Sequence, residues 1–383
     1  MKRTGAIFLG VVMLLVMTIA GCNEDSVTND PVDIPVPAAP SGLAASEVSS
    51  SKVLLSWTDA SSDEAGFYIE RKTDNGGFTR VASPPENSAA WTDSGLTVGT
   101  YTYRVAAWRD TLVSAWSNEA AVTLKAPEKV AIIADHTTAK LSLVPSQWID
   151  TAKSKLHIAY GHTSHGSQIT TGMQGLASWK GSQYAYAKLG TNGALDLRDT
   201  PFTGAYDLGN PNRISWEAAT RTYLNANPTV NVVMWSWCGQ VSSATAADSE
   251  TYLSLMSGLE KDFPEVKFVY MTGHLDGTGL TGNCHLRNEQ IRAYCRANAK
   301  ILFDFNDIEM YNPDGVYFGD KKPNDACDYT DGTIKGNWAT EWQNKHTKGI
   351  DWYDCSSAHS QPVNANMKAY AAWWLFARLA GWE

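Results

Sequence analysis

The spacing of hydrophobic residues divides the chain into two regions with different periods. Between residues 37 and 125, short runs such as VLLSW, GFYIERK and YTYRVAAW alternate apolar with polar positions, and turn-rich segments separate them. Alternation with a period of two is typical of strands that bury one face, and turns at this spacing are typical of an antiparallel sandwich. We therefore predict an all-β sandwich domain over residues 37–125.

From residue 129 onward the pattern is that of an α/β protein. The continuous apolar runs LHIAY, VNVVMWSW, VKFVYMTG and AKILFDF are separated by segments with helical spacing. Strands that are apolar on both sides belong in a parallel sheet that helices cover on both faces. The last segment, NANMKAYAAWWLFARLAGW, predicts an amphipathic helix rather than a membrane span, because Lys368 and Arg378 interrupt it.

The first 22 residues predict a targeting signal. A basic start and the apolar run IFLGVVMLLVMTIA are followed by Gly21 and Cys22. The sequence IAGC resembles a bacterial lipobox, which implies cleavage before Cys22 and lipidation of its thiol. Residues 23–36 are acidic and lack apolar periodicity, as expected of a linker. We expect an extracytoplasmic, lipid-anchored protein of the outer membrane or cell surface, with a simple signal peptide or a membrane helix as the alternative.

Composition narrows the classes of partner. A net charge of -9 argues against nucleic acid or an anionic membrane surface as the main partner. The 15 tryptophans favour a sugar-stacking face only slightly, because most tryptophans pack in cores. In an oxidising compartment the cysteines after Cys22 predict up to two disulfides, and a bridge between Cys327 and Cys355 is expected. No CxxC pair occurs, which argues against a structural zinc site.

Polar clusters follow the predicted strands of the second region. GHTSHG follows LHIAY, CGQVSS follows VVMWSW, GHLDG follows KFVYMT, and DIEMYNPDG follows AKILFDF. In parallel sheets of this kind, ligands bind at the carboxyl ends of the strands. Together with His359 near the C-terminus, these clusters predict one shared catalytic cleft.

Ser164 stands where a nucleophile is expected. It follows the first of these strands closely, Gly166 permits a tight turn, and QITTGMQGLASW can begin a helix. A sharp turn from strand to helix exposes such a hydroxyl, and nearby backbone amides can hold an oxyanion. Ser167 lies deeper in the predicted helix and is the alternative.

The residues of the first region closely resemble a fibronectin type III domain. The resemblance rests on PSGL, on Trp57 in LLSWTD, and on GFYIERK, GTYTYRV and SNEAAV. It implies that Trp57 is buried between the two sheets and that Tyr101 is the corner tyrosine. The region contains no catalytic cluster, so we expect a spacer or a weak binding module.

Residues 129–383 resemble the SGNH/GDSL hydrolases, esterases with a three-layer, flavodoxin-like fold. HTSHG is similar to the H-x-S-x-G variant of the serine block, which implies that Ser164 is the nucleophile. KLGTNGA resembles the second block, whose glycine amide joins the oxyanion hole; Gly193 is the better match and Gly190 the alternative. In place of the third block stands WCGQ, where Gln240 is expected to supply the amide donor.

The resemblance also implies that His359 is the general base toward Ser164 and then the acid toward the leaving alkoxide. Ser356 occupies the position of the usual acid, so we assign the carboxylate that orients His359 to Asp354, with Asp351 as a second candidate. A dyad oriented by a backbone carbonyl is a further possibility. The alternative interpretation of His359 is a surface or helix-capping histidine.

The remaining histidines are interpreted as supporting residues. We expect His162, His165 and His274 to shape the site or contact substrate. Asp276 and His285 lie near His274 in the sequence, so zinc-dependent hydrolysis is a minority alternative. HTSH is not the HExxH motif and has no glutamate between its histidines, and DACDYTDG lacks full calcium-loop spacing. We therefore expect no metal or other cofactor.

These observations predict an extracytoplasmic serine esterase that removes O-acetyl or similar small acyl groups from a polysaccharide through an acyl-serine intermediate. The anchoring and the accessory sandwich favour a carbohydrate ester over a lipid. The expected partners are the acylated polysaccharide and, through the lipid anchor only, the membrane; nucleic acid is not expected. The alternative from another class is a surface glycan-binding or adhesion lipoprotein whose hydrolase fold has lost its chemistry.

Overall fold

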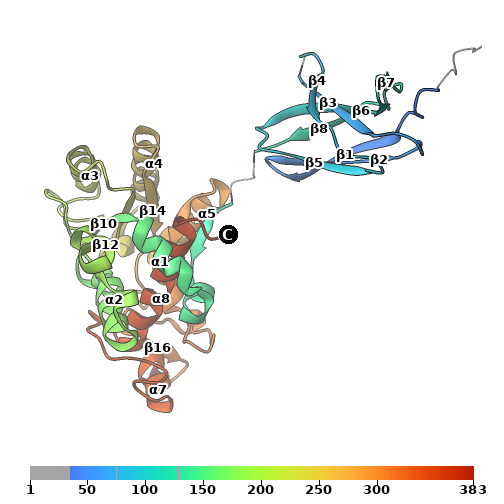
Figure 1. Cartoon of the computed structure of the whole chain (residues 1–383). Helices are drawn as coiled ribbons and strands as arrows, with labels where there is room; N and C mark the ends of the chain where they lie inside the picture. Colours follow the sequence, from blue (N-terminus) through green and yellow to red (C-terminus); the bar gives the residue numbers. More distant parts are fainter. Residues whose placement is uncertain (1–34, 75, 127–129) are drawn as a thin grey trace, which may run out of the picture. The chain divides into compact units, whose positions relative to one another are not determined.

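The structure, a computed structural model, describes residues 35–74, 76–126 and 130–383. The chain divides into two compact units, residues 1–128 and 129–383 (Figure 1). The predicted signal peptide, Cys22 and nearly all of the linker lie outside the described residues. Within the three described stretches, no helix combines the length and the hydropathy needed to cross a membrane.

The first unit contains two antiparallel sheets. One sheet has the order β1 (Ser41–Ser49), β2 (Lys52–Thr58), β5 (Ala90–Ser94). The other has the order β4 (Thr79–Ala82), β3 (Gly66–Thr73), β6 (Gly99–Arg109), β7 (Leu112–Val113), and β8 (Ala120–Leu124) also pairs with β6. Along β2, Val53, Leu55 and Trp57 are buried while the residues between them are exposed. The alternation in the sequence thus becomes the inner face of a sandwich.

Two of the residues singled out in the sequence occupy the expected places in this sandwich. Trp57 is buried, and its ring lies 5.6 Å from that of Phe67 in the opposite sheet. The hydroxyl of Tyr101 donates to the carbonyl oxygen of Thr97 at 2.7 Å and accepts from the Thr97 backbone N–H at 3.1 Å. Tyr101 therefore pins the turn that precedes β6.

The second unit is built on a seven-stranded sheet in which every pair is parallel. Its order is β11 (Tyr186–Ala187), β12 (Leu195–Asp199), β10 (His157–Gly161), β13 (Val232–Trp235), β14 (Lys267–Met271), β15 (Ile301–Phe303), β9 (Ile132–Ala134). All residues of β13 are buried, because both faces of this central strand are covered. The prediction of a parallel α/β sheet is confirmed.

Helices cover both faces of this sheet (Figure 1). One core joins the sheet to α1 (Ser146–Lys155), α2 (Ser167–Lys180) and α8 (Pro362–Leu379). The other joins it to α3 (Ser215–Ala226), α4 (Ala246–Asp262) and α5 (Asn283–Ala297). Shorter elements complete the unit: α6 (Phe305–Glu309), α7 (Trp338–Lys345), the hairpin β16 (Asp328–Asp331) and β17 (Ile334–Asn337), and the 3₁₀ helices η1 (His136–Thr138), η2 (Leu141–Leu143), η3 (Ser164–Gly166), η4 (Ser182–Tyr184), η5 (Lys188–Gly193), η6 (Gly239–Ser243) and η7 (Gly319–Lys321).

The last helix differs from its sequence-based description. α8 begins with Pro362 at its first turn, as helices often do, but most of its residues are buried. Lys368, expected to mark a polar face, is fully buried and forms an ion pair with Glu309 of α6 at 2.7 Å. An internal counter-charge makes this burial possible, which the sequence of α8 alone could not indicate.

The expected disulfide between Cys327 and Cys355 is wrong. Both are free thiols, as are the other three cysteines that the structure describes. Cys327 Sγ lies 3.2 Å from Ser360 Oγ, whereas Cys355 Sγ lies 3.4 Å from Asn366 Nδ2. Each thiol therefore has its own polar partner.

Candidate active site

The Ser164 turn lies at the carboxyl edge of the sheet, between the end of β10 and the start of α2. Ser164 is exposed and has a φ of +28°, a value that costs energy for a residue with a side chain. Its hydroxyl makes no hydrogen bond within the described part of the chain. The rival, Ser167, donates its hydroxyl to the Ser164 carbonyl oxygen at 2.6 Å. Ser167 thus stabilises the turn, while Ser164 presents a free hydroxyl.

Glycine is required within this turn. A Cβ at Gly166 would lie 2.2 Å from Ser236 Oγ and 2.4 Å from His162 Cβ. Such distances are far shorter than van der Waals contact, so β10, η3 and the segment after β13 can pack together only with glycine here. The expected role of Gly166 in a tight turn therefore has a steric basis.

His359 meets the Ser164 turn although the two are far apart in the sequence. The His359 ring stacks on the ring of His165 with 4.5 Å between centroids. Gln168 Nε2 donates to the carbonyl oxygen of Ala358 at 2.5 Å, so the first turn of α2 holds the segment that carries His359. His359 is exposed and has a φ of +62°. No hydrogen bond joins its ring to Ser164 in the part of the chain described.

The acid that we assigned to His359 lies elsewhere. Asp354 is exposed and pairs with Lys348 at 2.5 Å, and Asp351 accepts a backbone N–H from Thr347 at 2.8 Å. Neither carboxylate hydrogen bonds with His359, so the assignment of Asp354 is corrected. Both bond within their own loop, which leaves no carboxylate from this segment for the site.

The carboxylate that bonds to His165 is that of Asp325. Its Oδ2 accepts a hydrogen bond from His165 Nε2 at 2.9 Å. Ligand atoms of Asp325, His165 and His359 all lie within 4.8 Å of one another. Sequence reasoning had noticed Asp325 only as part of the oxygen-rich stretch DACDYTDG, and nothing local indicated that this loop reaches the sheet edge.

The expected oxyanion donor Gly193 lies at the wrong edge of the sheet. It ends η5, which directly precedes β12, and β12 runs parallel to β10 with His157 opposite Asp196. Gly193 and the alternative Gly190 are therefore at the amino edge, whereas Ser164 follows the carboxyl end of β10. The assignment to Gly193 is corrected, because a glycine-rich motif before a strand cannot reach a site after the neighbouring parallel strand.

Gln240 lies at the carboxyl edge as expected, where its side chain bridges two loops. Gln240 Oε1 accepts the backbone N–H of Cys238 at 2.9 Å, and Gln240 Nε2 donates to Asp207 Oδ1 at 3.2 Å. Asp207 also accepts a hydrogen bond from the Thr163 hydroxyl. The buried carboxylate of Asp207 thus connects the Ser164 turn with the loop after β13.

A second nucleophilic arrangement involves Cys238, which sequence reasoning considered only for disulfides. Cys238 Sγ lies 3.5 Å from His165 Nδ1, and the other nitrogen of this ring bonds to Asp325. Burial lowers the pKa of His165, but the hydrogen bonds with Asp325 and then Cys238 outweigh it and raise the pKa to about 9. The bond with His165 in turn lowers the pKa of the Cys238 thiol, against the effect of burial. This geometry favours a thiolate–imidazolium pair.

His274 also stacks on His165, with 3.7 Å between ring centroids. Its Nδ1 donates to the Leu275 carbonyl oxygen at 2.6 Å, and its Nε2 is buried without a partner. Burial is the main cause that lowers the pKa of His274. A neutral His274 can lie beside a charged His165 without repulsion.

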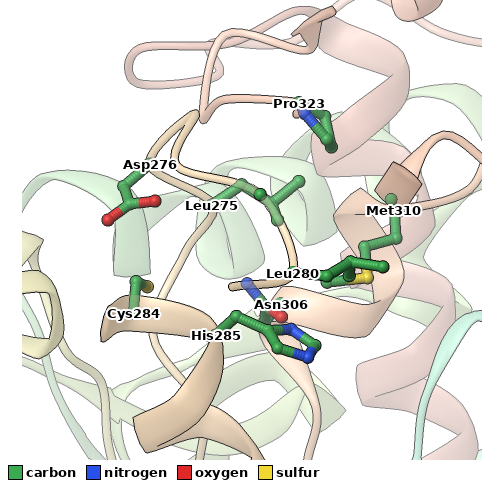
Figure 2. A pocket seen from close by; sticks show the side chains of 10 residues that line it. Leu275, Asp276, Leu280, Cys284, His285, Asn306, Met310 and Pro323 are labelled. Carbon is green, nitrogen blue, oxygen red and sulfur yellow. The ribbon is translucent and has the colours of Figure 1, made fainter. Parts of the chain in front are cut away.

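Beside the Ser164 turn, a metal ion would be held by His165, Asp325 and His359. A second described group, Asp135, His136 and Asp307, also has ligand atoms within 4.8 Å of one another. Both nitrogens of His165 already have partners, so a metal ion would displace the hydrogen bond with Asp325 or the contact with Cys238. Asp276 and His285, the other candidate ligands suggested by the sequence, do not converge. Figure 2 shows the Asp276 carboxylate and the His285 ring directed to different sides of their small pocket, and Asp276 accepts the backbone N–H of Thr278 at 3.0 Å.

His162 is buried and lies between the end of β10 and Ser164. Its Nε2 bonds to Asp199 Oδ1 at 2.6 Å, and Asp199 ends the neighbouring strand β12. The His162 side chain lines a pocket of about 300 Å³ at the carboxyl ends of β10 and β12. It therefore fits the expected role of shaping the site.

The comparisons with known proteins include a family match within the N-terminal unit. The family model described as "Fibronectin type III domain" matches residues 38–123. Exoglucanase B of Cellulomonas fimi is 30% identical over 201 residues, which are 48% of this chain and 18% of that protein, so the chain spans less than a fifth of this relative.

Solved structures with similarity to the chain include an Fn3-like protein from Clostridium thermocellum. It is 30% identical, with 24% of this chain and 99% of that chain covered, at a TM-score of 0.21. A crystal structure of titin domains is 26% identical, covering 24% of this chain and 33% of that one, also at a TM-score of 0.21. The family match shows that residues 38–123 form a fibronectin type III domain, as the sequence predicted.

Proposed function

We propose that residues 129–383 form an SGNH-like serine esterase that hydrolyses a carbohydrate ester through an acyl-serine intermediate. The observation that carries the proposal is the stacking of the His359 ring on His165, the residue after Ser164, with 4.5 Å between ring centroids. Ser164 and His359 are both exposed, both have a positive φ, and both lie on loops that the first turn of α2 holds together. Backbone strain that surrounding contacts maintain is concentrated at catalytic sites.

The strand order supports the finer fold assignment. The succession β12, β10, β13, β14, β15 is the order of flavodoxin-like doubly wound sheets. In such sheets the ligand binds where the direction of strand addition reverses, which here is between β10 and β13. Ser164 follows β10 and Cys238 follows β13, so the candidate site coincides with this point.

In the proposed reaction, His359 accepts the proton of Ser164 as the hydroxyl oxygen attacks the ester carbonyl. The backbone N–H groups of Ser164 and His165 begin the turn that continues into α2, and they donate to no acceptor within the described residues. They are positioned to hold the oxyanion. His359 then protonates the leaving alkoxide. In the second half of the reaction, His359 accepts a proton from water as the water oxygen attacks the acyl-serine, and it returns the proton to the Ser164 oxygen when the acid is released.

His165 contributes positive charge beside the reacting carbonyl. Its hydrogen bonds with Asp325 and Cys238 hold the ring in place, and its raised pKa of about 9 keeps it protonated at neutral pH. A fixed cation near the developing oxyanion lowers the barrier most effectively when its orientation does not have to change during the reaction. Asp325 offsets the cost of burying this charge.

A thiol esterase is the second candidate, because Cys238, His165 and Asp325 already form a hydrogen-bonded chain. In this mechanism Cys238 Sγ attacks the carbonyl carbon, and His165 donates its proton to the leaving alkoxide. The substrate class stays the same, since both candidate nucleophiles lie beside His165. The similarity to an exoglucanase supports a carbohydrate setting, although only 18% of that protein is matched.

The test uses the chain without its first 22 residues, with p-nitrophenyl acetate and acetylated xylan as substrates. We expect Ser164→Ala to lower kcat by about a thousandfold or more. Ser167→Ala is the matched control, because that hydroxyl bonds within the turn, and it should retain most activity. Loss with Cys238→Ala but not with Ser164→Ala would establish the thiol mechanism instead. Activity that survives both substitutions but disappears with a chelator would establish a metal-dependent hydrolase, and a wild-type protein that hydrolyses no ester would support the non-catalytic alternative.

A further inference from the structure

A pocket of about 300 Å³ adjoins the Ser164 turn at the carboxyl ends of β10 and β12. Six residues line it: Gly161, His162, Thr200, Phe202, Ala205 and Tyr206. Four of them belong to the loop that follows β12, which takes no part in the proposed acyl-transfer chemistry. Because the strand order is β12, β10, β13, the pocket lies on the side of β10 away from β13, and Cys238 is in the loop that follows β13.

Tyr206 is the unusual residue of this pocket. It is 66% exposed, whereas its neighbours Ala205, Asp207 and Leu208 are 4%, 1% and 0% exposed. A large aromatic ring loses favourable burial when it stands in solvent, and here the residues beside it are all buried. The loop therefore holds the ring outward at the rim of the pocket.

The loop that carries Tyr206 is fixed relative to the nucleophile. Asp207 accepts hydrogen bonds from the Thr163 hydroxyl and from the backbone N–H of Gly209 at 2.8 Å. The backbone N–H of Leu208 donates to the Ser236 carbonyl oxygen at 3.0 Å. Thr163 precedes Ser164 and Asp207 follows Tyr206, so one side-chain hydrogen bond ties the exposed ring to the catalytic turn.

The remaining walls combine aromatic surface with fixed polar groups. The ring of Phe202 stacks on Trp235 with 4.2 Å between centroids, which fixes its orientation. Thr200 contributes a hydroxyl at an exposed position, and His162 is held by Asp199 at 2.6 Å. Sites for polar ligands of this size pair apolar contact area with a few fixed hydrogen-bonding groups. An acyl-chain pocket would instead have a uniformly apolar lining.

We propose that this pocket binds the sugar ring that carries the ester, with the ring stacked on Tyr206. A sugar presents a face of C–H groups that packs on an aromatic ring and hydroxyls that bond to polar groups such as Thr200. The pocket then sets the position of the scissile acyl group relative to Ser164. This inference rests on the proposed esterase function and assigns its alcohol part to a sugar.

The first test compares two substrates that differ in the sugar. Tyr206→Ala is expected to reduce kcat/KM for acetylated xylan at least about tenfold more than for p-nitrophenyl acetate, mainly through KM. Tyr206→Phe keeps the ring and should behave like the wild type, and Ile214→Ala removes another exposed apolar side chain of the same connection as a matched control. Equal effects of Tyr206→Ala on both substrates would overturn the proposal.

A binding measurement separates failure of this inference from failure of the esterase proposal. Titration calorimetry with acetylated oligosaccharides of xylan, glucomannan and chitin is carried out on Ser164→Ala and on Ser164→Ala/Tyr206→Ala proteins. We expect at least one oligosaccharide to bind the first protein and to bind the second at least about tenfold more weakly. If none binds, or if binding is the same in both proteins, the sugar pocket is refuted even when the wild type hydrolyses p-nitrophenyl acetate.

Discussion

Lys368 carries a positive charge in the middle of the last helix, and its removal gives a sharp test of how the core supports the site. Lys368 and Glu309 are both fully buried and lie 2.7 Å apart. Lys368 Nζ also donates to Asn364 Oδ1 at 3.0 Å and to Gln168 Oε1. Burial lowers the pKa of Lys368, and the Glu309 carboxylate opposes this shift.

This ion pair lies at the junction of the segments that form the candidate site. Glu309 Oε2 accepts the backbone N–H of Leu275, the residue after His274, at 2.9 Å. Gln168 connects Lys368 to the carbonyl oxygen of Ala358, the residue before His359. The Lys368–Glu309 pair therefore helps to hold His274 and His359, which both stack on His165.

Lys368→Met leaves the Glu309 carboxylate buried without its counter-charge. Breaking a buried pair from one side costs about 3–5 kcal/mol of unfolding free energy. For a domain of this size that corresponds to a decrease in Tm of about 6–20 °C, measurable by scanning calorimetry of the whole chain. The fibronectin type III transition should not change and serves as the internal reference.

The double variant Lys368→Met/Glu309→Gln removes both charges. We expect it to be more stable than Lys368→Met, because no uncompensated charge remains and the glutamine can still accept the Leu275 N–H. A cost below about 1 kcal/mol for Lys368→Met, or a double variant less stable than both single variants, would refute the argument.

Three further predictions concern the site. The pKa of His165 is raised from 6.5 to about 9, so its contribution to the free energy of unfolding is complete below pH 6.5 and is lost as the pH rises to 9. In urea unfolding, His165→Gln should lose less unfolding free energy over this pH range than the wild type. An equal loss in the two proteins would contradict the assignment. Cys238 should react with iodoacetamide at pH 7 faster than the other described cysteines, as measured by peptide mapping. His165→Gln should slow the reaction of Cys238. Faster labelling of another cysteine would contradict the thiolate–imidazolium pair of Cys238 and His165. Gly166→Ala should reduce kcat strongly, because its Cβ would lie 2.2 Å from Ser236 Oγ. Gly193→Ala, at a φ of +71° but at the opposite edge of the sheet, should cost about 1 kcal/mol of stability and leave kcat unchanged. Equal kcat values for the two variants would contradict the placement of the site.

The fibronectin type III domain was predictable from its sequence because its signals are local. Burial along β2 repeats the alternation of VLLSW, and Tyr101 bonds to Thr97 only four residues away. The parallel sheet was predictable for a similar reason, since runs such as that of β13 are apolar on both faces. The family match to residues 38–123 confirms the first of these predictions.

The candidate site was predictable only in part. The polar clusters after the predicted strands indicated a site at the carboxyl edge of the sheet, and the structure places the Ser164 turn, Gln240 and His274 at that edge. Gly193 was misplaced because motif similarity does not say whether a loop precedes or follows its strand in space. Asp354 was assigned, with Asp351 as the second candidate, because sequence proximity to His359 was the only guide. Asp325, which bonds to His165, was not considered for this role because its loop comes from another part of the chain.

The partners of a buried charge are equally hidden from the sequence. Lys368 interrupts an apolar helix, and that pattern ordinarily marks an exposed position. Its counter-charge, Glu309, belongs to a different helix, so burial could be recognised only after both helices were placed. The same holds for Cys238, whose histidine partner follows another strand.

The identity of the nucleophile is tested most directly by covalent trapping with a fluorophosphonate, an electrophile that forms a stable adduct with activated serines. Peptide mapping by mass spectrometry should locate the adduct on Ser164 in the wild-type protein. The adduct should be absent from His359→Ala, because that variant lacks the general base. An adduct on Ser167 or Cys238, or trapping of Ser164 that is unchanged in His359→Ala, would contradict the proposed serine esterase.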